Sequence, residues 1–281
     1  MRLVTIRLDG GTRAGRLDGD EVTVLSQPDV AAVLRLGATW RDWARAADGP
    51  RLALSEVDLA PLVPQPGKII CLGLNYRAHV EEMGREMPSH PTVFAKFAEA
   101  LVGARDPIIL PRVSDQVDWE VELAFVIGSP VRHVSEADAA AAIAGYTIFN
   151  DVSVRDWQNR TLQFLQGKTF ESSTPVGPAL VTADEVDGAV DLEVSCSVDG
   201  KLMQRGRTSD LVFKPAAIVS YLSDVVTLKP GDIIATGTPA GVGHGRKPPV
   251  YLRPGQVVTT RIEGLGEMVN PCVAEGATSS G

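Results

Sequence analysis

Three features are scarce in this sequence, and each absence excludes a class of protein. The 281 residues contain only three cysteines, Cys71, Cys196 and Cys272, with no CxxC pair, so neither a disulfide framework nor a structural zinc site is expected. No apolar run approaches the roughly 18 residues of a membrane span. The opening MRLVTIRLDGG lacks the apolar stretch of a signal peptide. We therefore expect a cytoplasmic protein with no membrane partner.

An excess of basic residues is also missing. Lys and Arg number 27 against 35 Asp and Glu, which gives a net charge of −8. This balance argues against a basic surface for nucleic acid and leaves carboxylates available for a hard cation. Hydrophobic residues make up 44% of the chain, which excludes intrinsic disorder.

The common catalytic and nucleotide-binding motifs are absent or incomplete. Gly167-Lys168-Thr169 resembles the end of a phosphate-binding loop, but Leu162 stands where that loop requires glycine. The glycines of residues 241–245 lack dinucleotide-binding spacing. Neither GxSxG nor HExxH occurs, and four well-separated histidines argue against a histidine-rich zinc or iron site.

The pattern that is present predicts a strand-rich α+β protein in two parts. Residues 1–26 alternate as short strands, and residues 28–47 have helical spacing. The segment DLAPLVPQPGK is rich in proline and is the best linker candidate. We place a small N-terminal domain at 1–65, the main domain at 66–272 and a flexible tail at 273–281.

The main domain alternates short strands with short helices. Helices are expected after the N-cap Ser135, from Ser153 to about Leu165, and from Pro215. A doubly wound parallel sheet is not favoured, because long helices do not alternate regularly with the strands. The predicted strands are 68–74, 119–128, 146–152, 191–200, 232–238 and 257–266.

Two glutamates in the strand 119–128 are the first candidate site. Glu120 and Glu122 are two residues apart, so both carboxylates share one face of the strand, with Cα atoms roughly 6–7 Å apart. Asp151 follows another strand end. Three carboxylates would suit Mg²⁺ or Mn²⁺. The alternatives are an exposed charged strand face and an ordinary turn aspartate.

The segment NYRAHVEEMG contains a candidate acid–base pair. If it is helical, His79 and Glu82 share a face, and the carboxylate can orient the imidazole as a general base. The alternative is a charged surface helix. Gly84, Pro88 and Pro91 bound this segment closely, which fits a short lid over a site.

Further polar residues follow Asp151. Arg155 and Gln158 share a helical face, and the arginine could hold a substrate carboxylate. Lys168 could stabilise an enolate or oxyanion. Residues 236–241, TGTPAG, form a turn whose backbone N–H groups could bind an anion. A solvated charge or a simple turn is the alternative in each case.

Five segments follow one another along the main domain: KIICLGLNYRAHVEEMG, VDWEVELAFVIG, GYTIFNDVSVRDWQ, QGKTFESSTPVGP and TGTPAGVG. In this order they resemble the fumarylacetoacetate hydrolase superfamily, in its bacterial two-domain type. The resemblance covers about residues 66–272. It implies a mixed β-roll catalytic domain with a small N-terminal α/β domain, a homodimer, and one divalent metal per site, Mg²⁺ or Mn²⁺, with Ca²⁺ also able to fill the site in a crystal.

The resemblance also implies a role for each candidate residue. Glu120, Glu122 and Asp151 would be the metal ligands. His79 and Glu82 would be a catalytic dyad on a lid. The residues expected to face the substrate are Lys168, Arg155, Gln158 and Thr238.

A small oxo acid is the expected substrate. The preferred reaction is hydrolysis of a C–C bond in acylpyruvate-like, 2,4-dioxo acid substrates. The same residues could support decarboxylation or isomerisation of oxo-dicarboxylic acids, including oxaloacetate-like and 2-hydroxyhepta-2,4-diene-1,7-dioate-like compounds, or hydrolysis of diketo-deoxy sugar acids. A non-catalytic small-acid binder is the remaining alternative.

Overall fold

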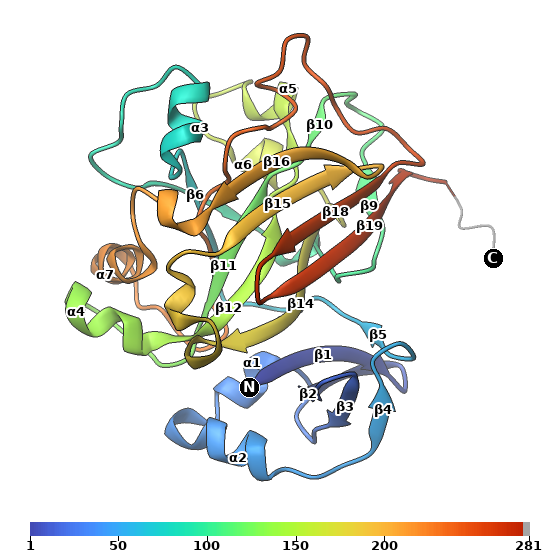
Figure 1. The fold of residues 1–281 in the computed structure, drawn as a ribbon, viewed down its shortest axis with the longest axis vertical. Helices are drawn as coiled ribbons and strands as arrows, with labels where there is room; N and C mark the ends of the chain where they lie inside the picture. The colour runs from blue at the N-terminus through green and yellow to red at the C-terminus, as the bar shows by residue number, and fades with distance from the viewer. Residues whose placement is uncertain (278–281) are drawn as a thin grey trace.

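The computed structural model describes residues 1–277. One large mixed sheet contains strands from both the N-terminal part and the rest of the chain (Figure 1). The sheet begins with an antiparallel meander. Its strands are β1 (Arg2–Leu8), β2 (Gly11–Asp18), β3 (Glu21–Val24) and β4 (Arg51–Ala53). Strand β1 then pairs with β14 (Thr174–Thr182), so the first strands extend the sheet of the rest of the chain.

The predicted helix over 28–47 is two short helices. Asp29 caps α1 (Val30–Leu34) by accepting a hydrogen bond from the N–H of Ala32, and α2 (Trp40–Ala46) follows a 3₁₀ turn. The proline-rich linker candidate is a packed connection, in which β5 (Asp58–Leu59) pairs with β1. Leu62 in this connection is fully buried.

The centre of the sheet is buried on both faces. Past β14 come β12 (Ile143–Asn150), β11 (Val121–Ile127), β17 (Ile233–Ala235), β6 (Ile69–Gly73) and β7 (Thr92–Lys96). Val121, Leu123 and Phe125 face one core. Ala124 and Val126 face a second core beneath α1 and α2, so β11 is covered on both sides.

A second sheet packs against the first and completes the β-rich α+β fold (Figure 1). Its strands are β16 (Lys201–Arg207), β15 (Glu193–Val198), β18 (Val257–Ile262), β19 (Gly266–Ala274) and β9 (Ile108–Leu110). Helix α7 (Pro215–Val225) begins with a proline, as predicted, and lies beside α4 (Glu136–Ala139), which Ser135 caps.

Two short pairings complete the described strands. Strand β8 (Leu101–Val102) is parallel to β14, and β10 (Val117–Asp118) pairs with β13 (Ser153–Val154). No helix within residues 1–277 is long and apolar enough to cross a membrane.

Three local predictions are wrong. Ser153 lies in β13 and donates its hydroxyl to the Asp151 carbonyl, so it caps no helix. The expected helix to Leu165 is instead α5 (Arg155–Gln158), a loop, and α6 (Leu165–Lys168). Strand β19 runs to Ala274, so the predicted tail begins too early, and its residues 278–281 lie outside the described part.

Candidate active site

One cavity gathers side chains from segments far apart in the sequence. Helix α3 (Arg77–Glu82) carries the predicted dyad, and it lies near α5 and α6 at the upper end of the molecule in Figure 1. The loop after β17 and the residues that lead into β11 complete the walls. The cavity encloses about 140 Å³, a volume that holds a benzene-sized molecule.

The three predicted carboxylates meet at the inner end of this site. One oxygen from each of Glu120, Glu122 and Asp151 lies within 4.8 Å of the others, and all three residues are buried. Glu122 lies in strand β11 and Glu120 immediately precedes it. Asp151 follows the end of the neighbouring β12, and its N–H donates to the Glu120 carbonyl. The alternative of an exposed charged strand face is therefore wrong.

Two buried lysines hold the cluster together. Lys168 Nζ lies 2.8 Å from Glu120 Oε2 and 2.7 Å from Asp151 Oδ2. Lys96 Nζ lies 2.7 Å from Asp151 Oδ1 and donates to the Val152 carbonyl. The sequence analysis missed Lys96, the last residue of β7. The available signal was a single lysine within the apolar run VFAKFA.

The carboxylates respond differently to being buried together. Burial would raise the pKa of Glu120, but Lys168 and Arg155 hold it down at about 2. Burial, with the charges of Asp151 and Glu120, raises the pKa of Glu122 well above its usual range. Negative charge at Glu122 is thus poorly compensated by the protein, which is the condition that a divalent cation relieves. The buried, all-oxygen donor set fits Mg²⁺ or Mn²⁺.

The structure confirms the geometry of the predicted dyad. His79 Nδ1 lies 2.9 Å from Glu82 Oε2, one helical turn apart on α3. Burial would raise the pKa of Glu82, but hydrogen bonds from His79 and from the Gly241 N–H keep it below its usual value. The charged carboxylate can therefore orient the imidazole of His79, which lines the cavity.

The TGTPAG turn binds carboxylates of the protein itself. The Gly237 N–H donates to Glu122 Oε2 at 2.7 Å, and the Gly241 N–H donates to Glu82 Oε1 at 2.9 Å. Gly237 has a φ of +95°, which side chains rarely adopt. One turn thus supports both the metal-type cluster and the dyad.

Arg155 has different partners from those that its position suggested. Its guanidinium lies 2.7 Å from Asp118 Oδ2 and 2.7 Å from Glu120 Oε1, and its Nη1 also donates to Gln158. Arg155 was expected to bind a substrate carboxylate directly. The structure does not support this expectation, since Arg155 already contacts two carboxylates of the protein. Asp118, fully buried, was missed by the sequence analysis.

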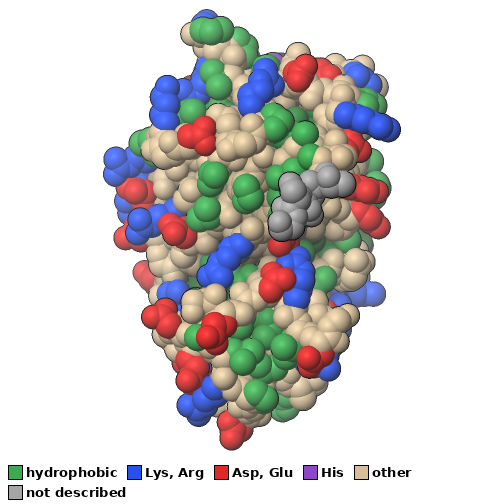
Figure 2. Space-filling model, turned by 90° about the vertical axis from the view of Figure 1, so that its right-hand side faces the viewer, with side chains coloured by type: hydrophobic (Ala, Val, Ile, Leu, Met, Phe, Trp, Pro, Cys, Tyr) green, Lys and Arg blue, Asp and Glu red, His purple; other side chains and the backbone are tan. Residues whose placement is uncertain are grey.

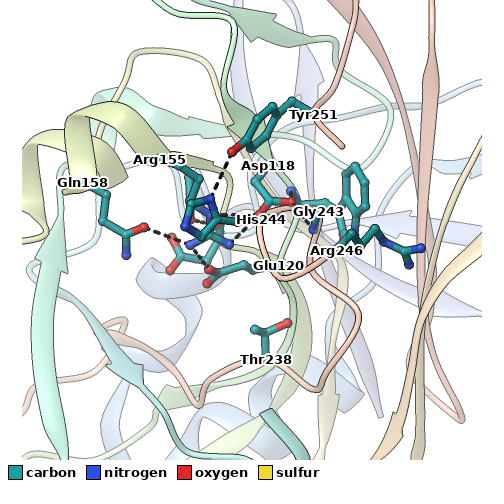
Figure 3. A network of polar contacts seen from close by, with 12 residues as sticks. Asp118, Glu120, Arg155, Gln158, Thr238, Gly243, His244, Arg246 and Tyr251 are labelled. Atoms are coloured by element: carbon teal, nitrogen blue, oxygen red, sulfur yellow. Dashed lines mark hydrogen bonds and ion pairs between the residues drawn. The ribbon is translucent and has the colours of Figure 1, made fainter. Parts of the chain in front are cut away.

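The remaining predicted residues line the cavity. Gln158 lies beside Arg155 (Figure 3). Thr238 donates its hydroxyl to the Val121 carbonyl and accepts a hydrogen bond from Gln204. Residues that sequence reasoning did not select also line it: Leu72, Gly73, Leu74, Met83, Arg85, Phe94, Asn159, Phe164 and His244. These come from β6, β7, the segments beside α3, α5 and α6, and the loop after β17.

The chain belongs to the fumarylacetoacetate hydrolase family. The family model described as "Fumarylacetoacetate (FAA) hydrolase C-terminal" matches residues 68–273, and a model described as "Rv2993c-like, N-terminal" matches residues 1–61. The fold and the buried acidic site thus define a two-part enzyme of this family, as the resemblance implied.

Its relatives include isomerases and hydrolases. The chain is 42% identical to the mitochondrial oxaloacetate tautomerase of Rattus norvegicus, over 95% of this chain and 87% of that protein. A structure described as a putative HpcE protein from Mycobacterium smegmatis has a TM-score of 0.90 and 36% identity, covering 98% of this chain and all of that one.

A further solved relative includes a metal ion. It is maleylpyruvate hydrolase from Sphingobium sp. SYK-6 in complex with manganese(II) and pyruvate, with a TM-score of 0.81 and 32% identity. The match covers 98% of this chain and 99% of that one.

Proposed function

We propose that this protein is a divalent-metal-dependent isomerase that interconverts the keto and enol forms of a small oxo-dicarboxylic acid such as oxaloacetate. The observation that carries the proposal is that His79, paired with Glu82, lines the same cavity as Glu120 of the carboxylate cluster. The tautomerase relatives support isomerisation over the C–C hydrolysis preferred from sequence. The small cavity volume is consistent with a four-carbon substrate.

The metal site would be held by Glu120, Glu122 and Asp151. Mg²⁺ or Mn²⁺ there would supply Lewis-acid stabilisation of the negative charge that develops on the 2-oxo oxygen. Lys168 keeps two of these carboxylates in place and, with its pKa raised by Asp151 and Glu120 against the effect of burial, remains a cation beside them.

The proton transfer would be carried out by the dyad. Nδ1 of His79 donates to Glu82, which leaves Nε2 as the basic atom. His79 takes a proton from C3 of the keto form, the C–H electrons form the C2–C3 double bond, and the C2=O π electrons move to the oxygen. The His79 imidazolium then gives its proton to that oxygen. The reverse transfer regenerates the ketone, so no other reactant is consumed.

Enol decay tests the proposal directly. The absorbance of freshly dissolved oxaloacetate enol is followed with purified protein and Mn²⁺, and then with EDTA. We expect metal-dependent acceleration that falls by about 100-fold or more in His79→Ala, because general-base catalysis typically contributes at least that much. His133→Asn is the control, since His133 is an exposed histidine paired with Asp224. Wild-type rates in His79→Ala would refute the role of the dyad.

C–C hydrolysis is the second candidate, and one observation favours it. The maleylpyruvate hydrolase relative aligns along nearly the whole chain. In that reaction His79 would deprotonate a water that attacks the distal carbonyl. An acylpyruvate incubated with the Mn²⁺-loaded protein separates the two, because only hydrolysis produces pyruvate and a free acid.

A further inference from the structure

A second histidine lines the cavity and has no part in the mechanism above. His244 lies on the loop after β17, together with the glycines that contact the dyad. A Cβ at Gly245 would lie 3.1 Å from Glu82 Cδ, so this loop packs directly against the dyad. In Figure 3 the His244 ring lies between Tyr251 and Glu120.

The backbone beneath the ring is fixed by a buried carboxylate. The His244 N–H donates to Asp118 Oδ2 at 2.9 Å, and the Gly243 N–H donates to Asp118 Oδ1 at 2.7 Å. Asp118 also accepts from Arg155 Nε at 2.9 Å, so the loop is tied to the arginine that contacts Glu120. His244 is thus held at a defined position in the wall.

A tyrosine determines which ring nitrogen carries the proton. His244 Nδ1 lies 3.0 Å from the Tyr251 hydroxyl. Burial and Asp118 raise the pKa of Tyr251, so its hydroxyl stays protonated at neutral pH. Among residues 1–277 the hydrogen-bond partner of this hydroxyl is Nδ1, which accepts the bond when the hydroxyl donates. Nε2 then carries the hydrogen of a neutral imidazole.

The environment also keeps His244 neutral. Burial and the positive charge of Arg155 lower its pKa, against smaller opposing effects of Asp118 and Glu120. Within the described residues, Nε2 of His244 has no hydrogen-bond partner. The atom is not buried, so it remains accessible. Two other cations of the cavity, Arg155 and Lys168, form ion pairs with carboxylates of the protein.

We propose that the Nε2–H of His244 binds the substrate carboxylate that is farther from the Glu120, Glu122 and Asp151 cluster. His244 would therefore make the cavity selective for oxo-dicarboxylic acids over monocarboxylic ones. This inference rests on the proposed function, whose substrate class it specifies. The exposed Arg85 also lines the cavity and is the competing candidate for this role.

Two unreactive probes test the inference independently of catalysis. Malate and 2-hydroxybutanoate share a 2-hydroxy acid group, but only malate has a second carboxylate. Their binding to the Mn²⁺-loaded protein is measured by isothermal titration calorimetry. We expect wild type to prefer malate, and His244→Asn to lose about ten- to a hundred-fold of its affinity for malate, the usual effect of losing a hydrogen bond to a charged group. Binding of 2-hydroxybutanoate should stay unchanged.

The choice of variants separates selectivity from folding. Asparagine places its amide near the position of Nδ1 and removes Nε2, whereas His244→Gln reaches the Nε2 position and should recover part of the preference. The control His133→Asn should behave as wild type, since Asn tolerates the positive φ of His133. A wild-type protein without a malate preference would overturn the inference. So would a malate preference that is kept in His244→Asn and lost in Arg85→Met. A malate preference without catalysed enol decay would refute the proposed isomerase and not the His244 assignment.

Discussion

At the residue scale, the chemistry of the site depends on how the carboxylates are compensated. Glu120 is paired with Lys168 and Arg155, whereas Glu122 accepts a neutral backbone N–H from Gly237. Asp151 lies between the ammonium groups of Lys96 and Lys168. The protein thus orients three carboxylates and leaves the charge of one poorly compensated.

Removing one ligand should remove the metal. In Glu120→Gln we expect the Kd for Mn²⁺, measured by calorimetry, to rise by at least about 100-fold, because an amide is a poorer ligand for a hard cation than a carboxylate. Glu81→Gln, on the exposed side of α3, is the matched control and should bind Mn²⁺ as wild type does. Equal affinities of wild type and Glu120→Gln would remove Glu120 from the ligand set.

At the element scale, α5 and α6 position Arg155 and Lys168 by packing closely. A Cβ at Gly167 would lie 2.4 Å from the backbone nitrogen of Gln158, so only glycine allows this approach. The side chains of Arg155 and Lys168 converge on Glu120 because α6 folds back against α5. A single continuous helix could not place them in this way.

Gly167→Ala should therefore separate the two helices. We expect a loss of about 1–3 kcal/mol in unfolding free energy, the usual effect of overpacking, together with weaker Mn²⁺ binding as Lys168 moves. Urea unfolding and calorimetry measure the two effects. The control is Gly11→Ala, where an added Cβ meets no atom within 4 Å. Equal stability of Gly167→Ala and wild type would contradict the close packing.

The same two helices show where local pattern fails. The run after Asp151 has helical spacing, and Ser153 has the character of an N-cap, yet the chain forms β13 and two separate turns of helix. Pairing of β13 with β10 and the contact of Gly167 with Gln158 outweigh the local preference. The pairing of β13 with β10 joins segments that no local window of sequence contains.

At the scale of the whole molecule, the net charge of −8 coexists with a cluster of acids in its interior. The raised pKa of Glu122 means that folding favours its protonated form. Its contribution to stability is complete below its usual pKa of 4.5 and is lost as the pH rises through the raised value. A bound divalent cation should offset this loss by stabilising the ionised form.

The metal-free protein should therefore become less stable with rising pH than Glu122→Gln. The midpoint of urea unfolding in EDTA, measured from pH 4.5 upward, gives the comparison. Addition of Mn²⁺ should raise the wild-type midpoint most at the high end of this range. Parallel pH profiles for wild type and Glu122→Gln in EDTA would contradict the proposed strain in the cluster.

The sequence by itself determined the features that depend on neighbours in the chain. Period-two spacing placed Glu120 and Glu122 on one face, and helical spacing brought His79 to Glu82. The order of the family motifs was also sufficient to identify the superfamily.

Only the tertiary structure decided which distant groups complete the site. Lys96, Asp118 and His244 enter it through strand pairing and loop packing, and Arg155 is bound by carboxylates that lie 37 and 35 residues before it. The physical reason is that a buried charge is costly unless a compensating group lies beside it, and that group can be far away in the sequence.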